Sequence, residues 1–471
     1  MAKKVYVGPL GDFEYDDSEF EFRQDKDTGK KYLAYKAINF DGSTIQIPDG
    51  IKDCYKMFAD CEYMHTPPKI PKGVEKCDKM FEGCRSLHYL PKIPDGVTSC
   101  KETFAYCEQI ETARTLPSTL TDCYGMFKGC KKLEDVQRLP DSIKDCREMF
   151  AYCNRINYVP NVPASAETCS RMFVGCKHLK KAPDLPNGVK NCNGMFSSCS
   201  DLSIAPKSIP DTVTSASFMF SGCYALHNDA PAVPGSVKDC RYMYQNTGIM
   251  FAPHIGDGVE DCEGMFKGCD ILFESTEIPD SVKNCANMFE NCSVLTTAPS
   301  HLPEGITSCE RMFAETMIVE TKFTIPDSVT NCNGMFENSH DIKTPVAIPE
   351  GVVDCTNMYK NCYELTAAPS VPASVEQTDG MFEGCSPKVE KAGKWNIKHR
   401  DQSYYDKMAT YDTVSFETEP EPSDEWDEPT IPDDAESAVT RDELQEKYGE
   451  ISNDKRETEV DDDDYDFDPV D

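Results

Sequence analysis

The chain has 471 residues, with 82 acidic and 48 basic side chains, so its formal net charge is −34. A surface of this sign is repelled by nucleic-acid phosphates and by anionic lipid headgroups, which excludes general binding to nucleic acids or to membrane surfaces. No stretch of 18 apolar residues is present to span a bilayer, so membrane insertion is not expected. Residues of apolar type make up 39%, enough for a core, and the length favours several domains or a repeat array over one globule.

The first segment, residues 1–45, precedes the repeats described below. It begins with MAKKVYVGPL, which lacks the apolar run of a secretory signal, so the chain as written is expected in the cytoplasm. A virion or a non-classical surface location is the alternative. Further on, FEFRQ and KYLAYKAI flank a turn, a pattern typical of an antiparallel hairpin. We therefore predict an N-terminal β-hairpin cap over residues 1–45, covering one end of the repeats.

A repeated unit occupies residues 46–385, and its cysteines mark the period. Seven cysteines follow one another at intervals of 23 residues from Cys54 to Cys192, and the register then continues, with slips of one residue, as far as Thr378. The result is fifteen units of the form VxxCxxMFxxCxxLxxAPxxIPDG. A unit of this length cannot bury its own apolar face, so the units must stack into a solenoid.

Each unit is expected to contain one short helix and one short strand. Val, Cys, Met, Phe and Cys stand at i, i+3, i+6, i+7 and i+10, the spacing of one helical stripe. The residue before the first Cys is Asp, Ser, Asn or Thr in thirteen units, as at helix N-caps, and the residue before the second Cys is Gly or Asn in ten units, which favours a left-handed helix end. Prolines such as Pro91 and Pro183 keep the strand short. The predicted fold class is an α/β repeat solenoid, leucine-rich-repeat-like, of about fifteen 23-residue units.

The repeats resemble a known family. VKDCREMFAYCNRI and VEDCEGMFKGCDIL are similar to the BspA-like leucine-rich repeats, especially the surface-protein variant VxxMxxMFxxCxxL, and IPDGVTSC resembles the IPxxVTSI of the treponemal type. The resemblance covers about residues 46–392, and it departs from the family in placing Cys where Met or Ile is common. Because members of the family are mostly non-enzymatic surface or secreted adhesins, the resemblance implies binding.

All 25 cysteines fall in two columns of the repeat, thirteen in the first and twelve in the second. If the two columns formed disulfides within a unit, both cysteines of that unit would be replaced together. Yet Cys223 shares its unit with Ala216, and Cys240 shares its unit with Thr247. Seven residues of helix would also separate the two columns by about 10.5 Å, too far for a disulfide. Their spacing does not suit zinc. We predict buried free thiols, with disulfides between neighbouring units as the open alternative, and no cofactor or metal.

The candidate interaction surface is the pair of variable residues that follows the conserved Leu of each unit. Side chains here change from unit to unit on a constant frame, which is how a solenoid acquires a selective surface. The residues chosen as protein-binding are His88 and Tyr89, Asn157 and Tyr158, Lys180 and Lys181, and Phe273 and Glu274. Catalytic motifs such as GxSxG, HExxH or a phosphate loop are absent from the sequence, so the chain is not expected to be an enzyme.

Two segments follow the repeats. Residues 386–415 lose the motif but keep Trp395, Tyr404 and Tyr405, and we expect them to form a C-terminal cap. Residues 416–471 hold 24 acidic and 4 basic side chains. Too few apolar groups remain there to offset the entropy of an ordered chain, so we predict a disordered acidic tail.

The predicted function is a non-catalytic scaffold for protein–protein interaction or adhesion, with a protein as its partner. Two alternatives stay open. The chain could be an attachment or assembly component of a virus or phage, or its acidic tail could mimic a polyanion and occupy a basic protein.

Overall fold

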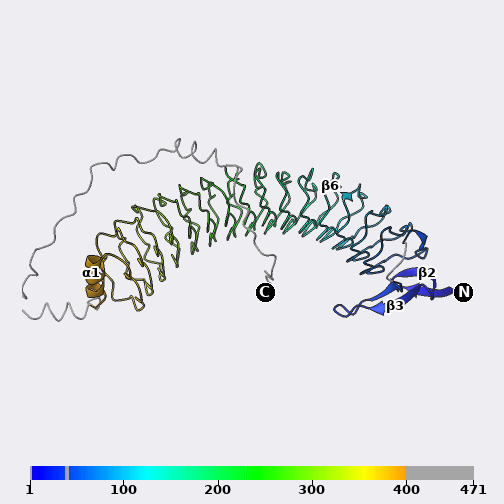
Figure 1. Cartoon of the computed structure of the whole chain (residues 1–471), viewed down its shortest axis with the longest axis horizontal. Coiled ribbons are helices and arrows are strands. Elements are labelled where there is room, and N and C mark those ends of the chain that lie inside the picture. The colour runs from blue at the N-terminus through cyan, green and yellow to red at the C-terminus, as the bar shows by residue number, and fades with distance from the viewer. Residues whose placement is uncertain (1–2, 38–41, 229, 399–471) are drawn as a thin grey trace, which may run out of the picture. The chain divides into compact units, whose positions relative to one another are not determined.

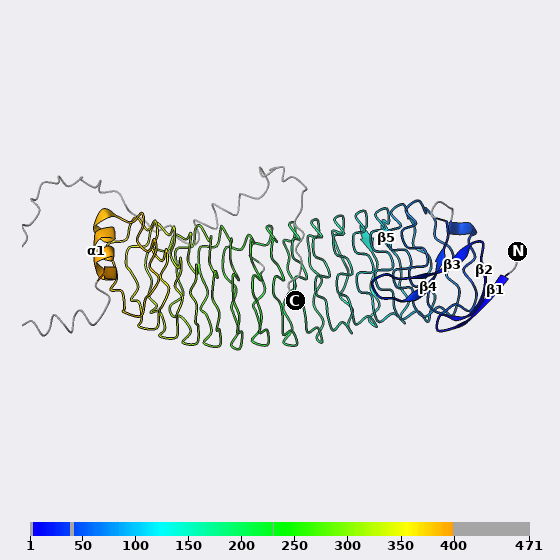
Figure 2. The ribbon, with the colours of Figure 1, turned by 90° about the horizontal axis from the view of Figure 1, so that it is seen from below.

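The structure is a computed structural model that describes residues 3–37, 42–228 and 230–398. Two compact units divide the chain at residue 410. The second unit lies outside the described residues, as do the predicted acidic tail, 416–471, and residues 399–415 of the predicted C-terminal cap. In the first unit the repeats form coils that lie side by side in one continuous row, as two perpendicular views show (Figures 1 and 2).

Four strands precede the coils and form two antiparallel hairpins. They are β1 (Lys3–Gly8) with β2 (Gly11–Asp16), and β3 (Phe20–Gln24) with β4 (Lys31–Tyr35). The second hairpin is bonded to the first coil, because the N–H of Tyr35 donates to the carbonyl of Met57 at 2.9 Å and the ammonium of Lys56 lies 2.6 Å from the carboxylate of Asp25. A short 3-10 helix, η1 (Gly42–Thr44), leads into the coils.

The prediction of one short helix per unit was wrong. Counting the first-column residue of each coil as position 0, positions 0 to 7 form two successive tight turns: Met57 donates to the carbonyl of Cys54, and Cys61 to that of Phe58. Positions 2 and 6 are left-handed, with φ of 48° at Lys56 and 61° at Asp60, as the third residue of a type II turn requires. Each turn closes a hydrogen bond from residue i+3 to residue i, so the side chains of Cys, Met, Phe and Cys all point into the core. Their spacing in the sequence is close to that of a helix, which is why the pattern was taken for one.

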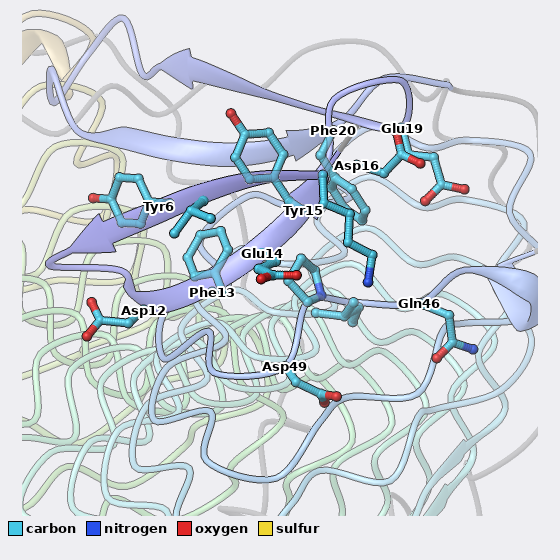
Figure 3. A pocket seen from close by; sticks show the side chains of 14 residues that line it. Tyr6, Asp12, Phe13, Glu14, Tyr15, Asp16, Glu19, Phe20, Gln46 and Asp49 are labelled. Atoms are coloured by element: carbon cyan, nitrogen blue, oxygen red, sulfur yellow. The ribbon is translucent and has the colours of Figure 1, made fainter. Parts of the chain in front are cut away.

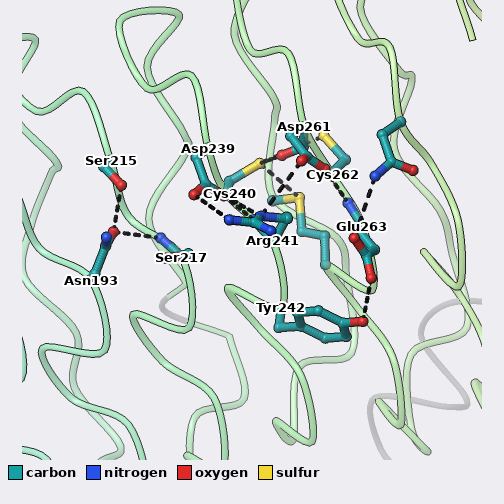
Figure 4. A network of polar contacts seen from close by, with 12 residues as sticks. Asn193, Ser215, Ser217, Asp239, Cys240, Arg241, Tyr242, Asp261, Cys262 and Glu263 are labelled. Atoms are coloured by element: carbon teal, nitrogen blue, oxygen red, sulfur yellow. Dashed lines mark hydrogen bonds and ion pairs between the residues drawn. The ribbon is translucent and has the colours of Figure 1, made fainter. Parts of the chain in front are cut away.

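The residues expected to cap helices open turns instead. Asp122 accepts the N–H of Tyr124 at 3.3 Å, and Asp354 accepts that of Thr356 at 2.8 Å, which are Asx turns. At Ser215 the acceptor comes from the preceding coil, whereas Ser308 itself accepts the N–H of Glu310 at 3.2 Å. Asn193 accepts both the hydroxyl of Ser215, at 2.6 Å, and the N–H of Ser217, at 3.0 Å (Figure 4).

The left-handed geometry expected at Gly and Asn before the second column is confirmed, although it ends a turn and not a helix. These residues have φ between 59° and 74° at Gly83, Gly129, Gly175, Gly222, Asn291 and Asn361. The glycines that follow the two tyrosines of this column have a steric reason. A Cβ on Gly175 would lie 2.6 Å from the ring of Tyr152 in the coil before, and one on Gly129 would lie 2.7 Å from the ring of Tyr106.

Backbone bonds join each coil to the next; those from the tight turns run forward, whereas others, such as that from Lys180 to Asn157, run back. In the third coil the N–H groups of positions 0, 2, 4 and 6 donate to carbonyls of the fourth, and the same set recurs along the row. For that coil the bonds are Cys100 to Asp122 (2.9 Å), Glu102 to Tyr124 (2.7 Å), Phe104 to Met126 (2.9 Å) and Tyr106 to Lys128 (2.6 Å). Turns that donate outward in this way satisfy their amides only when another coil lies beside them.

One column of the core is a continuous stack of aromatic rings. The aromatic rings at position 4, from Phe58 to Phe382, stack on one another with centroids 5.5 to 5.9 Å apart in every neighbouring pair of coils. The last coil is covered by α1 (Pro387–Lys398), in which Val389 is buried, Gly393 lies against the ring of Phe382, and Glu390 accepts the N–H of Gly384 at 3.0 Å.

Candidate protein-binding surface

The variable pairs stand at positions 11 and 12 of their coils, and the structure places them in one row. The only named strands among the described coils, β5 (Thr112–Ala113) and β6 (Asp135–Val136), begin at position 12 and pair in parallel. Isolated parallel bridges continue this row from Tyr158 to Lys181 and on to Ile204. The residue before each pair is a fully buried Leu or Ile, so the backbone that carries the pairs is fixed by the core.

Most of the predicted residues are exposed, including Tyr89 at 61% and Tyr158 at 52%. Phe273 differs from the prediction because it is half-buried. Its ring meets that of Phe251, in the preceding coil, edge to face at 4.8 Å. Glu274, beside it, is exposed.

The eight residues do not form one site. Asn157 and Tyr158 lie in the coil before Lys180 and Lys181, and the N–H of Lys180 donates to the carbonyl of Asn157 at 3.3 Å. The His88 and Tyr89 pair lies three coils earlier, where the ring of His88 is 5.6 Å from that of His65. Phe273 and Glu274 lie four coils later. We call the four neighbouring residues together with Ile204 the central patch: Asn157, Tyr158, Lys180, Lys181 and Ile204.

Charge sets the central patch apart. A hollow of about 420 Å³ beside it is lined by Glu134, Arg155, Asn157, His178, Lys180 and Asp201. An ion pair of Arg155 with Glu134 and a hydrogen bond between His178 and Asp201, both at 2.9 Å, close its walls. Lys180 and Lys181 form no ion pair within the described part of the chain. Their charges are therefore free to meet an acidic partner.

The sequence prediction missed one residue of the patch. Ile204 occupies position 12 of the coil after Lys181 and is 45% exposed. The sequence could have indicated Ile204, because an aliphatic residue stands here at the position that Lys181 occupies in the preceding coil. With Tyr158 it places apolar surface on both sides of Lys181.

The cysteines are core residues with a defined polar role. All 25 are free and buried. In the second column, the thiol of Cys176 donates to the carbonyl of Phe150, in the preceding coil, at 3.0 Å, and that of Cys199 donates to Phe173 at 3.1 Å. Ser339 replaces such a cysteine and donates to Phe313 at 2.6 Å. The other two non-cysteine residues of this column, Thr247 and Thr316, also donate to buried carbonyls, those of Tyr244 and Phe313 in their own coils.

Thiol chemistry follows from the same burial. Desolvation raises the pKa of Cys176 to about 12 and that of Cys309 to about 12, so both thiols are protonated at neutral pH. A protonated buried thiol is neither a nucleophile nor a metal ligand. Among the described residues, no group of three or more His, Cys, Asp and Glu side chains is arranged to hold a metal ion. The described helices also include none with the length and apolarity needed to cross a membrane.

The repeats match a known family of proteins. The profile described as "BspA type Leucine rich repeat region (6 copies)" matches residues 36–157, 123–238 and 262–388, well over half of the chain. A search of curated proteins finds no match. A leucine-rich repeat protein of Bacteroides ovatus, known from its crystal structure, is 20% identical with a TM-score of 0.50, covering 78% of this chain and 97% of that one.

Two further crystal structures are similar at lower scores. A leucine rich cell surface protein of Faecalibacterium prausnitzii is 18% identical with a TM-score of 0.38, covering 76% of this chain and 94% of that one. A leucine-rich repeat protein of Eubacterium ventriosum is 16% identical with a TM-score of 0.37, covering 82% and 96%. At these identities the similarity of the Bacteroides protein concerns the fold alone, and the two lower scores support no argument.

Proposed function

The chain belongs to the family of BspA type leucine-rich repeat proteins, and we propose that it is a non-catalytic scaffold that binds a protein through the central patch. The observation that carries the proposal is the pairing of exposed apolar side chains, Tyr158 and Ile204, with two lysines that have no ion-pair partner in the described chain. Tyrosine surrounded by charge is a frequent anchor of protein interfaces. The expected partner presents an acidic surface with an apolar centre.

Rigidity supports the same proposal. The backbone of the patch is bonded to the coils on both sides, through Lys180 to Asn157 and through Ser203 to Lys180 at 3.1 Å. A surface that is already ordered loses little conformational entropy when a partner binds. The other predicted pairs, His88 with Tyr89 and Phe273 with Glu274, would then extend the contact along the same row for a long partner.

The test compares two variants of the full chain as bait in extracts of the source cells. Replacing Tyr158 with Ala and Lys181 with Glu should remove a bound protein that the unchanged chain retains, with a loss of roughly tenfold or more in affinity. Tyr224→Ala is the matched control, since Tyr224 is 62% exposed but lies outside the row. Equal recovery of every partner by both variants would contradict the proposal.

A second proposal concerns the acidic tail, which the sequence favours with 24 acidic and 4 basic side chains in residues 416–471. Such a segment attracts basic proteins in the manner of a polyanion. We propose the boundaries 1–45, 46–385, 386–415 and 416–471 for the cap, solenoid, second cap and tail. A chain that ends at residue 415 separates the two functions, because a partner that it still binds does not depend on the tail.

We also propose a cellular location for the protein. Buried unpaired thiols suit a reducing compartment such as the cytoplasm, and a virion or a non-classical surface location is the alternative. Titrating thiols in the denatured, unreduced protein from its source tests this, with 25 free thiols as the expected result. A much lower count would place the protein in an oxidising environment.

A further inference from the structure

The first hairpin presents an unusual exposed strand. β1 pairs with β2 and with no other strand in the part of the chain that the structure describes, so its outer edge is open. Val5 and Val7 on this strand are 70% and 74% exposed. Proteins normally blunt such an edge, because a row of unpaired backbone groups beside β-branched side chains pairs readily with another strand.

Acidic side chains lie on the same face of the hairpin as the two valines. The register pairs Val5 with Glu14 and Val7 with Asp12, and directly opposed residues of an antiparallel pair share one face. Successive residues on one face of β2 are about 6.7 Å apart, the spacing of alternate side chains on any extended strand. The face therefore carries Val5 and Val7 beside Lys3 on β1, and is negative on β2.

A hollow of about 800 Å³ opens between this hairpin and residues 46–49 (Figure 3). Buried Phe13, Phe20 and Ile47 contribute to its lining. The charged residues that line it are Lys3, Asp12, Glu14, Asp16, Glu19 and Asp49. None of the five carboxylates forms an ion pair with a described basic side chain, whereas Asp17, outside the hollow, pairs with Lys4 at 2.8 Å.

We propose that a basic, extended segment of another protein adds as a strand to the open edge of β1. Its backbone bonds to β1, and its Lys or Arg side chains lie on the face of Val5 and Val7, where their alkyl chains cover the valines and their charged ends reach the carboxylates of Glu14 and Asp12. Main-chain bonds supply affinity in such strand addition, and alternate side chains supply specificity. Charge selects the occupant, since five carboxylates against one lysine repel both the chain's own tail and a second copy of net charge −34.

The proposed site is separate from the central patch, so its test uses a different ligand. The probe is a fluorescent peptide of sequence Val-Arg-Val-Arg-Val-Arg, titrated into the full chain. We expect binding that weakens with salt, together with slowed hydrogen exchange at residues 3–8. Asp12→Asn with Glu14→Gln should weaken binding roughly tenfold, because two charges are lost from the hollow. Asn at residue 12 keeps an acceptor for the N–H of Gly8, which Asp12 now binds at 3.2 Å.

Controls separate this site from capture by the acidic tail. Asp461→Asn with Asp462→Asn removes two charges from the tail and should leave both the affinity and the protection of residues 3–8 unchanged. Val5→Lys with Val7→Lys should abolish the protection by placing positive charges at the edge. Peptide binding without protection of residues 3–8 would overturn the proposal, as would equal binding of a Val-Glu peptide. Concentration-dependent dimers of the free chain that protect the same residues would overturn it in favour of a second copy.

Discussion

Two positions of the same coils differ sharply in the side chains that they tolerate. Position 7 is Cys in twelve coils and Thr or Ser in the other three, whereas position 12 includes Tyr158, Lys181, Ile204 and Glu274. The difference is hydrogen bonding inside the core. At position 7 a small donor adds a second hydrogen bond to a buried carbonyl: Cys176 reaches that of Phe150 at 3.0 Å, which also accepts the N–H of Cys153 at 3.1 Å. At position 12 the side chain meets water, so the fold does not restrict it.

The largest expected effect comes from a substitution in the buried aromatic stack. Phe173→Ala would remove one ring from the stack, in which neighbouring centroids lie 5.7 and 5.5 Å away. A cavity of this kind costs about 3–5 kcal/mol. Because coils contact only their neighbours, hydrogen exchange should rise most in the coils around residue 173. An even rise along the whole row would show that the coils unfold as one.

A smaller effect is expected from the thiol donor. Cys176→Val keeps the volume but removes one of two donors to the carbonyl of Phe150, which retains the N–H of Cys153, at a cost of about 0.5–1.5 kcal/mol. Cys176→Ser keeps a donor and should cost less, as Ser339 does natively at the same position. Urea unfolding of the two variants measures the difference. Equal loss in both would mean that column 7 selects size and not hydrogen bonding.

Acid should loosen the second hairpin before it affects the coils. A hydrogen bond from Lys56, with further bonds from the N–H and hydroxyl of Thr28, holds the pKa of Asp25 well below its usual range. Since the folded state favours the ionised form, the stabilisation is complete above about pH 4, where an unfolded carboxyl is ionised. It is lost as pH falls below that value. Near-UV circular dichroism of the hairpin tyrosines should report the change.

Two variants sharpen this expectation. Asp25→Asn should remove the acid dependence of the hairpin signal, because the carboxyl that binds Lys56 is no longer present to titrate. Glu21→Gln is the matched control, since Glu21 pairs with Arg23 at the surface at 2.8 Å. If Glu21→Gln removed the dependence equally, the anchor to the first coil would not be the titrating group.

The smallest effect is expected on the variable side. Tyr158→Ala should change the free energy of unfolding by no more than about 0.5 kcal/mol, because the side chain is 52% exposed. Thermal unfolding checks this. A loss of several degrees would assign Tyr158 to the core and move the interaction surface elsewhere.

Sequence reasoning predicted some local features and misread others for a physical reason. It recognised the left-handed glycines at position 6, such as Gly83 and Gly129, because only few residue types tolerate that backbone. It missed the second left-handed position, although Gly125 and Gly194 stand there, since Lys56 and Glu102 occupy it elsewhere. With one left-handed residue the pattern fits a helix end, and with two it fits only successive turns.

The candidate site was also predicted only in part. The row of variable pairs was predicted, because solvent-facing positions vary while Leu179 and its equivalents stay apolar. Which pairs adjoin, and which lysines lack a partner, depended on contacts between coils, such as the hydrogen bond between His178 and Asp201. A period of 23 residues relates each residue to its neighbour in the next coil but says nothing of how charged side chains pair.

By itself the sequence determined the period, the columns that face inward and the burial of the cysteines, because apolar residues repeated at fixed spacing must share one core. Only the tertiary structure decided that the repeats are turns. Their outward N–H groups, such as those of Cys100 and Phe104, find acceptors in the next coil, an alternative to helix bonds that exists only once coils stack. It also decided that β1 keeps an open edge, since pairing between strands is a property of the assembled fold.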